Sequence, residues 1–134
     1  MNESITIPGL RLSGSQNARE NWRTRSARVK RERSLARIMC SQELTKPTHW
    51  PALVVLTRIG PRRLDSDNLA SSAKAVRDGV ADWLGVDDGD ESKVQWLYEQ
   101  RAGAYAVEVA LQWPVKHVVV FNGIRCTSIK ITDE

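Results

Sequence analysis

The sequence predicts an α+β fold in a single domain: a small mixed β-sheet flanked by a long basic N-terminal helix and a second, central helix. Three observations predict it. The 134 residues suit one domain with a core of its own. Two stretches carry apolar residues at helical spacing. Runs of alternating or continuous apolar residues, rich in β-branched side chains, precede, separate and follow these stretches, which is typical of strands.

The composition favours an ordinary protein of the cytoplasm. Hydrophobic residues make up 41% of the chain, yet no apolar run approaches the roughly 18 residues that a membrane span requires. The N-terminus has no basic segment followed by an apolar one, so it lacks the pattern of a secretion signal. Cys40 and Cys126 stand far apart without C-x-x-C spacing, which indicates reduced structural thiols rather than a disulfide or a zinc site. We expect no membrane partner.

The first predicted element is a short strand. Residues 4–8 are rich in isoleucine and threonine and end at a proline, and residues 10–12 would extend the strand. The serine, glycine and asparagine side chains of residues 13–17 are typical of a loop.

A long basic helix is predicted over residues 24–44, which contain no glycine or proline. Thr24 or Ser26 would cap its start, and Pro47 marks its end. Its apolar residues fall loosely at helical spacing: Val29, Leu35, Ile38, Met39 and Leu44. Residues 11–37 carry nine basic side chains against two glutamates, a net charge of +7. This charge suggests a polyanionic partner such as nucleic acid, and the alternative is a solvated helix without a ligand.

Residues 52–59 form a continuous run of apolar and β-branched side chains that Gly60 and Pro61 close. We predict a strand that is buried on both faces for most of its length. The central helix is predicted to run from Asp67, which would cap it, to Gly85, a typical C-terminal glycine. Its apolar stripe consists of Leu69, Ala73, Val76, Val80 and Trp83 or Leu84.

Acidic side chains concentrate around this helix. Eight of the chain's sixteen acidic residues lie between Asp65 and Glu91, against two basic ones, although the net charge of the whole chain is +4. At 100° per residue, Asp67, Lys74 and Asp78 lie within about 20° of one another, opposite the apolar stripe. One face of the helix is therefore predicted to present two carboxylates and an ammonium group.

The rest of the chain predicts further strands. Residues 94–100 and 105–113 alternate apolar and polar side chains, and residues 101–104 would join them in a hairpin. Two more strands are predicted over residues 118–121 and 124–131, joined by an Asn-Gly turn.

The acidic residues have the chemistry of a metal site. Asp65 and Asp67 are two residues apart, so in an extended segment both carboxylates point the same way and can share one cation. Carboxylates suit Mg²⁺ or Mn²⁺. Asp87 or Asp88, returning from the far end of the helix, would supply a third carboxylate. The alternative for each residue is structural: Asp67 as a helix cap, and Asp87–Asp88–Gly89 as a solvated turn.

The pattern D-x-D-N-L…K-x-x-x-D…D-D runs through residues 62–69, 74–79 and 84–88. It resembles the signature of RusA-type Holliday junction resolvases, a family common in phages and prophages. The order of predicted strands and helices over residues 4–113 is also similar to that family.

The resemblance implies a fold and a function. Residues 1–134 would be a single RusA-like endonuclease domain, with residues 114–134 as a C-terminal extension that we predict as strands. The helix from Asp67 would be the active-site helix. The implied activity is that of a homodimeric, Mg²⁺-dependent endodeoxyribonuclease that resolves four-way DNA junctions by metal-assisted phosphodiester hydrolysis. Its partner would be branched DNA, without a small-molecule cofactor, and a phage-encoded protein would act in the cytoplasm of its bacterial host.

The resemblance also implies roles for single residues. Asp65 and Asp67 match the first two metal-binding aspartates of the family, and Asp88 matches the third, with Asp87 as its substitute. Lys74 matches the lysine near the scissile phosphate, where its charge would offset the charge that develops on the phosphorus.

The chain departs from the family pattern in two places. The interval from Asp67 to Lys74 is longer by about one helical turn than in the best-known members. A leucine precedes Asp65 where the family has a base, so Arg62 or Arg63 must supply positive charge there. The basic side chains that we expect to neutralise DNA are Arg62, Arg63, Arg23, Arg25, Arg28, Lys30 and Arg31.

Asn68 and Asp78 are expected to support the site from a second layer, without binding the metal themselves. The other function that the sequence allows is a non-catalytic nucleic-acid-binding protein. In that case the acidic cluster would only cap a helix and shape a turn.

Overall fold

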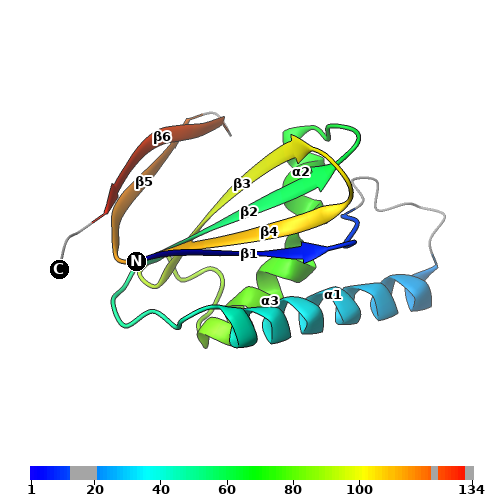
Figure 1. Ribbon diagram of the computed structural model, residues 1–134, viewed down its shortest axis with the longest axis horizontal. Coiled ribbons are helices and arrows are strands. Elements are labelled where there is room, and N and C mark those ends of the chain that lie inside the picture. The colour runs from blue at the N-terminus through cyan, green and yellow to red at the C-terminus, as the bar shows by residue number, and fades with distance from the viewer. Residues whose placement is uncertain (13–20, 122–123, 132–134) are drawn as a thin grey trace.

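The computed structural model describes residues 1–12, 21–121 and 124–131 and has an α+β fold (Figure 1). Its elements are β1 (Asn2–Pro8), α1 (Trp22–Glu43), β2 (Ala52–Gly60), α2 (Ser66–Ser72), α3 (Lys74–Leu84), β3 (Val94–Ala102), β4 (Ala106–Gln112), β5 (Val115–Phe121) and β6 (Ile124–Ile131). Strands β1 to β4 form one sheet, and β5 and β6 pair antiparallel in a second, two-stranded sheet. The predicted fold class is confirmed.

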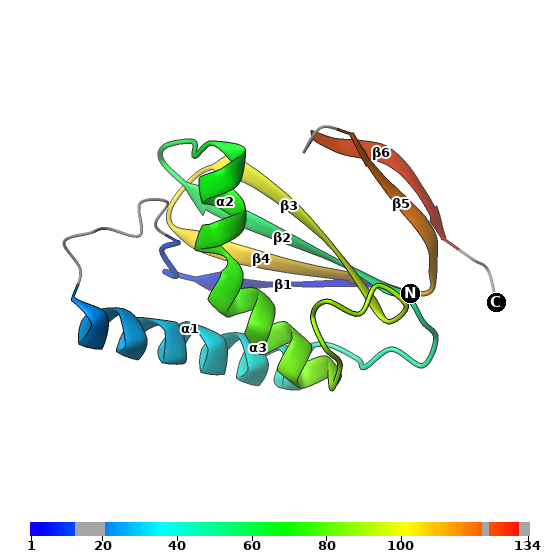
Figure 2. The same cartoon turned by 180° about the vertical axis from the view of Figure 1, so that it is seen from behind.

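The four-stranded sheet is mixed, with the strand order β1-β4-β2-β3. β2 pairs parallel with β3 and antiparallel with β4, and β1 pairs antiparallel with β4. The two shorter helices, α2 and α3, connect β2 to β3 across one face of the sheet, and α1 packs beside α3 (Figure 2). The main core lies between this face and the helices, and it includes Leu56 of β2, Val109 of β4, Val80 of α3 and Ala36 of α1.

β2 is buried along its whole length, as predicted. Val54 and Leu56 face the main core, whereas Leu53 and Val55 pack with Leu97 in a small second cluster. Alternate residues of a strand point to opposite faces, so β2 is enclosed on both faces as well as on both edges. A strand in this position has a continuous apolar sequence rather than an alternating one.

The predicted hairpin of β3 and β4 is wrong, because β2 lies between them. Thr57 of β2 is opposite Glu99 of β3 and Glu108 of β4. The link from β3 to β4 crosses the end of β2, where the Gly103 N–H donates to the carbonyl oxygen of Gly60 at 3.2 Å. Local turn residues do not distinguish such a crossing from a hairpin, since pairing partners are chosen by the whole sheet.

α1 is the predicted long basic helix, but its cap and its buried face differ from the prediction. Asn21 caps it by accepting a hydrogen bond from the Thr24 N–H at 2.9 Å, in place of Thr24 or Ser26. Ile38, which was predicted on the apolar stripe, is 41% exposed. The buried residues of α1 are Glu32, Ala36 and Cys40. Two of these are small, so the contact face is selected by close approach to α3 more than by apolar bulk.

The predicted central helix is broken into two. α2 ends at Ser72 and α3 begins at Lys74, with Ala73 between them at φ −91° and ψ 0°. The constant angular spacing that was expected from Asp67 to Lys74 therefore does not hold. The predicted cap is also wrong, because Asp65 is the N-cap of α2 and Asp67 lies in its first turn.

The predicted apolar stripe of the central helix is confirmed. Its buried members are Leu69, Ala73, Val76, Val80, Trp83 and Leu84. Gly85 ends α3 in the left-handed conformation at φ 74°, as expected for a C-terminal glycine.

The strands predicted at the two ends of the chain are confirmed by β1, β5 and β6, although residues 10–12 do not extend β1. The loop predicted over residues 13–17 and the Asn-Gly turn between β5 and β6 lie outside the described residues. Cys40 is a buried free cysteine, and burial raises the pKa of its thiol to about 12, which fits a structural thiol. Among the described helices, none is both long and apolar enough to cross a membrane.

α1 and α3 approach closely at Gly79. A Cβ atom built on Gly79 would overlap the carbonyl oxygen of Arg33 and lie 2.9 Å from the Cβ of Ala36. Beside this contact, the Arg33 guanidinium donates two hydrogen bonds to the carboxylate of Asp82, at 2.6 and 2.9 Å. The glycine is therefore required by packing against a neighbouring backbone, not by its conformation.

We predict that Gly79→Ala lowers the free energy of unfolding by roughly 1–3 kcal/mol, as overpacking does, despite the ~1 kcal/mol by which alanine favours a helix. Urea unfolding followed by circular dichroism measures this change. Gly89→Ala is the control, because its Cβ would meet only the Asp87 Oδ1 atom at an ordinary 3.6 Å. Equal stability of the two variants would contradict the close contact of α1 with α3.

Candidate functional site

Asp65 and Asp67 lie at the start of α2, shortly after the end of β2. The Asp65 carboxylate accepts hydrogen bonds from the backbone N–H of Asn68 at 2.8 Å and from the Asn68 side-chain amide at 3.1 Å. Asn68 thus fixes the orientation of Asp65, and its role beside a metal ion stays a prediction. Asp67 is exposed in the first turn, where the helix dipole favours a carboxylate.

The backbone just before Asp65 is held to the edge strand β3. The Leu64 N–H donates to Gln100 Oε1 at 2.9 Å, and the Gln100 side-chain amide donates to the Leu64 carbonyl oxygen at 2.7 Å. This pair of hydrogen bonds imitates one more step of sheet pairing after β2 has ended. It determines where the chain turns towards Asp65.

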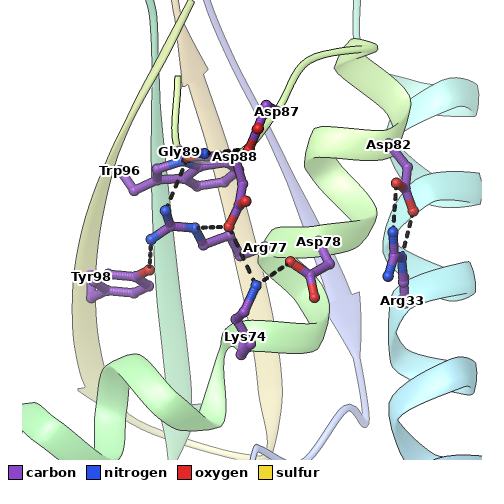
Figure 3. Close-up of polar contacts among 10 residues, drawn as sticks. All are labelled: Arg33, Lys74, Arg77, Asp78, Asp82, Asp87, Asp88, Gly89, Trp96 and Tyr98. Atoms are coloured by element: carbon purple, nitrogen blue, oxygen red, sulfur yellow. Dashed lines mark hydrogen bonds and ion pairs between the residues drawn. The ribbon is translucent and has the colours of Figure 1, made fainter. Parts of the chain in front are cut away.

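A second group of charged residues joins α3 to the loop that follows it (Figure 3). The Lys74 ammonium donates to Asp78 Oδ1 at 2.6 Å and to Asp88 Oδ2 at 3.4 Å. The Arg77 Nε–H donates to the same Asp88 oxygen at 2.9 Å. The structure therefore brings together Lys74 and Asp78, which the sequence predicted on one helix face, and adds Asp88 and Arg77 to them.

Arg77 is the centre of this cluster. One terminal N–H group donates to the Tyr98 hydroxyl at 2.8 Å and the other to the Asp88 carbonyl oxygen at 3.0 Å. The guanidinium carbon lies 4.9 Å from the centre of the Trp96 ring, and the Trp96 indole N–H donates to the same Asp88 carbonyl at 2.9 Å. These residues line a pocket of about 330 Å³ that also includes Glu91.

The contacts of Asp88 determine its charge. Burial raises the pKa of the Asp88 carboxyl group, but the charges and hydrogen bonds of Lys74 and Arg77 outweigh burial, so the pKa lies below its ordinary value. The hydrogen bond to Asp78 raises the pKa of Lys74. These contacts favour the charged forms of Lys74 and Asp88 at neutral pH.

The three predicted metal ligands are not gathered into one site. In the part of the chain that the structure describes, no group of three or more His, Cys, Asp or Glu side chains is placed to hold one metal ion. Asp65 caps α2, Asp88 faces two cations, and the Asp87 Oδ1 atom accepts a hydrogen bond from the Gly89 N–H at 2.9 Å. The assignment of Asp65, Asp67 and Asp88 to a metal remains a prediction.

The basic residues predicted to bind DNA lie in two places. Arg23, Arg25, Lys30 and Arg31 are exposed on α1, where Arg28 is half-buried, and Arg62 and Arg63 are exposed in the loop between β2 and α2. The start of α1 and this loop lie at the same end of the molecule (Figures 1 and 2). Part of the charge on α1 is used internally, since Arg28 forms an ion pair with the buried Glu32 at 3.4 Å.

Sequence reasoning missed Arg77, Trp96 and Tyr98 as members of the site. Two signals in the sequence pointed to them. Arg77 follows Lys74 by three residues, which places both on one face of a helix. Trp96 and Tyr98 are two residues apart in a strand and therefore share a face. Which helix faces that strand is decided by the tertiary fold, so the pattern alone does not bring them to Asp88.

No family model matches the chain. The chain is similar to an uncharacterized protein of Xylella fastidiosa (strain Temecula1), with 36% identity over 95 residues, which cover 64% of this chain and 60% of that protein. The chain thus spans about three fifths of its relative's length. The similarity assigns no activity to either protein.

We predict that Arg77→Met raises the pKa of Asp88, because one of the two cations that stabilise its carboxylate is removed while the side chain keeps its length. NMR titration of the side-chain carboxyl carbons measures this change. Asp90 is the internal control, since hydrogen bonds from Ser92 lower its pKa. A lowered carboxylate pKa stabilises the fold above the unfolded pKa of about 3.9, and that stabilisation is lost as the pH falls through the folded value. An unchanged Asp88 pKa in the variant would contradict the contact.

Proposed function

We propose that the protein is a Mg²⁺-dependent, structure-selective endodeoxyribonuclease that resolves four-way DNA junctions, as the RusA-type resolvases that it resembles do. One observation carries the proposal: Asp65 and Asp67 begin α2 beside exposed arginines, at the end of the molecule where the basic helix α1 also begins. Carboxylates that bind a cation, next to arginines that bind phosphate, are a combination suited to metal-assisted hydrolysis of a phosphodiester in DNA.

The donor types fit the proposed ion. Mg²⁺ usually takes one or two carboxylates directly and leaves its other positions to water and substrate phosphate. Asp65 and Asp67 would supply these carboxylates and Asp88 a third, and Mn²⁺ would suit the same oxygen ligands. When bound, the ion would supply Lewis acidity towards the scissile phosphate and lower the pKa of a coordinated water.

The chain's own residues would orient and neutralise. Asn68 holds the Asp65 carboxylate through two hydrogen bonds. Lys74 would offset negative charge on the phosphate that is attacked, because a fixed cation stabilises charge that develops in the transition state. Lys74 and Arg77 lower the pKa of Asp88 and so favour its carboxylate, the form that binds a cation.

The second candidate is a non-catalytic nucleic-acid-binding protein. It is favoured by the present use of the aspartates, since Asp65 caps a helix and Asp88 is paired with Lys74 and Arg77. In that reading the carboxylates have structural roles, and only the arginines meet the DNA.

We predict that the wild-type protein cuts synthetic four-way junctions when Mg²⁺ is present. The Asp67→Asn variant should cut them at a rate at least about 100-fold lower. A metal ligand is worth several kcal/mol in the transition state, which corresponds to this factor. Glu43→Gln, the same change of acid to amide in an exposed residue at the end of α1, should retain the wild-type rate. Gel analysis of labelled junction strands measures both. Junction binding without cleavage by the wild type would favour the second candidate.

We also predict a homodimer, because a junction is resolved by paired cuts in two strands. Size-exclusion chromatography with light scattering at micromolar concentration should give twice the chain mass of 15.1 kDa. A strict monomer under these conditions would contradict paired incision.

A further inference from the structure

A pocket of about 220 Å³ lies where β2 and β3 end, at Gly60 and Ala102. Four arginines contribute to its wall: Arg58, Arg62, Arg63 and Arg101. The described residues that line it include no aspartate or glutamate. A concave site lined by four cations and no lining carboxylate has the charge of an anion-binding site.

Arg58 is the most informative of these residues, because it is buried and its hydrogen bonds to described residues go to backbone carbonyls. It is 5% exposed and lies in the buried strand β2. Its Nε–H donates to the Leu12 carbonyl oxygen at 2.9 Å, and a terminal N–H group donates to the Arg62 carbonyl oxygen at 2.6 Å. Both acceptors are neutral, and no carboxylate of the described chain forms an ion pair with it. Since burying an unpaired charge is costly, an anion bound in the pocket would stabilise the Arg58 guanidinium.

The pocket is also fixed in place before any ligand arrives. The Arg58 guanidinium packs on Gly60, where an added Cβ would lie 2.9 Å from one terminal nitrogen and 3.0 Å from the guanidinium carbon. The hydrogen bond to the Arg62 carbonyl ties the loop that carries Arg62 and Arg63 to the same guanidinium. Arg62 and Arg63 are exposed, so their own side chains stay accessible.

We propose that this pocket binds a phosphate of the DNA backbone, one that neighbours the phosphodiester to be cut. The proposal rests on the proposed function and adds to it where the substrate strand is held. Arginine suits this role because its planar fork donates two parallel hydrogen bonds to a phosphate. Arg101 now pairs with Glu108 at 3.3 Å and is exposed, so a phosphate would compete with that partner.

The position of the pocket connects it to the aspartates. Gln100, which also lines the pocket, binds both backbone groups of Leu64, the residue directly before Asp65. The pocket wall and the start of α2 therefore share one support. A strand whose phosphate sits in the pocket would continue towards Asp65 and Asp67.

The test uses the exposed arginines, because Arg58 also holds two backbone carbonyls and its removal would disturb the fold. Arg63→Ala, Arg101→Ala and the double variant are compared with Lys46→Ala, which removes one exposed charge from the loop before β2. Affinity for a labelled four-way junction is measured in EDTA between 50 and 300 mM KCl. The slope of log affinity against log salt concentration is negative, and each single pocket variant should reduce its magnitude by about 1. The double variant should reduce it by about 2, and Lys46→Ala should leave it unchanged. Slopes equal to that of Lys46→Ala would overturn the proposal.

Gly60→Ala provides a second variant that moves a charge without removing one. Its new methyl group would shift the Arg58 guanidinium without removing its hydrogen-bond donors, so junction affinity should fall several-fold while circular dichroism shows an unchanged fold. Wild-type affinity in this variant would overturn the role given to Arg58.

The outcomes separate this proposal from the proposed function. Lowered slopes in a protein that never cuts junctions with Mg²⁺ would support the pocket and refute the nuclease. Cleavage with unchanged slopes would do the reverse. A wild type that does not bind the junction in EDTA would overturn the pocket. Inorganic phosphate tests whether the pocket binds a free anion. If phosphate raises the melting temperature of the wild type but not of the pocket variants, and all variants have the same salt slope for junction binding, the pocket binds a small anion and its assignment to DNA is wrong.

Discussion

The enclosure of β2 is the constraint on which the rest of the structure depends. Its neighbours β3 and β4 occupy both edges, and apolar side chains occupy both faces. Polar groups of the strand can therefore reach solvent only near its end, where Arg58 meets the pocket and the chain leaves towards Asp65. The parallel pairing with β3 in turn demands a crossover, which α2 and α3 supply. Asp65, Asp67 and the arginine pocket thus lie at the end of β2 where the strand is no longer enclosed.

The sequence predicted those features that depend on one segment alone. The continuous apolar run of β2, the stripe on α3 and the glycine after it are local patterns, and all three are present. The predicted hairpin of β3 and β4 was wrong because the strands that pair are determined by the whole sheet and not by the turn between two of them. The prediction of one continuous central helix failed because the spacing of apolar residues continues across Ala73, so only the backbone angles of Ala73 reveal the break. The predicted cap of α1 was wrong because several residues in that region have side chains that can cap a helix.

The same division applies to the candidate site. The aspartates and Lys74 stand out in the sequence because their spacing predicts that their side chains share one face of a strand or helix. Arg77 and Arg58 do not, since each acquires its importance from a partner far along the chain: Asp88 and Tyr98 for Arg77, and the Leu12 carbonyl for Arg58. For Arg58 the sequence does offer one indirect signal, because an arginine within a strand predicted to be buried needs a polar or anionic partner for its charge.

Negative and positive side chains at this end of the molecule form two separate groups, each with a net charge. Asp65 and Asp67 place negative charge at the start of α2, and the arginine pocket places positive charge beside it. On the proposed function, a cation held by the aspartates removes their repulsion of DNA, and a phosphate held by the arginines strengthens the local preference for a cation. Each ligand therefore favours the other by the same factor, since coupling between two binding equilibria is reciprocal. Asp88 takes no part in this coupling while it is paired with Arg77. Its release from Arg77 to a bound cation would therefore distinguish a catalytic site from a binding surface.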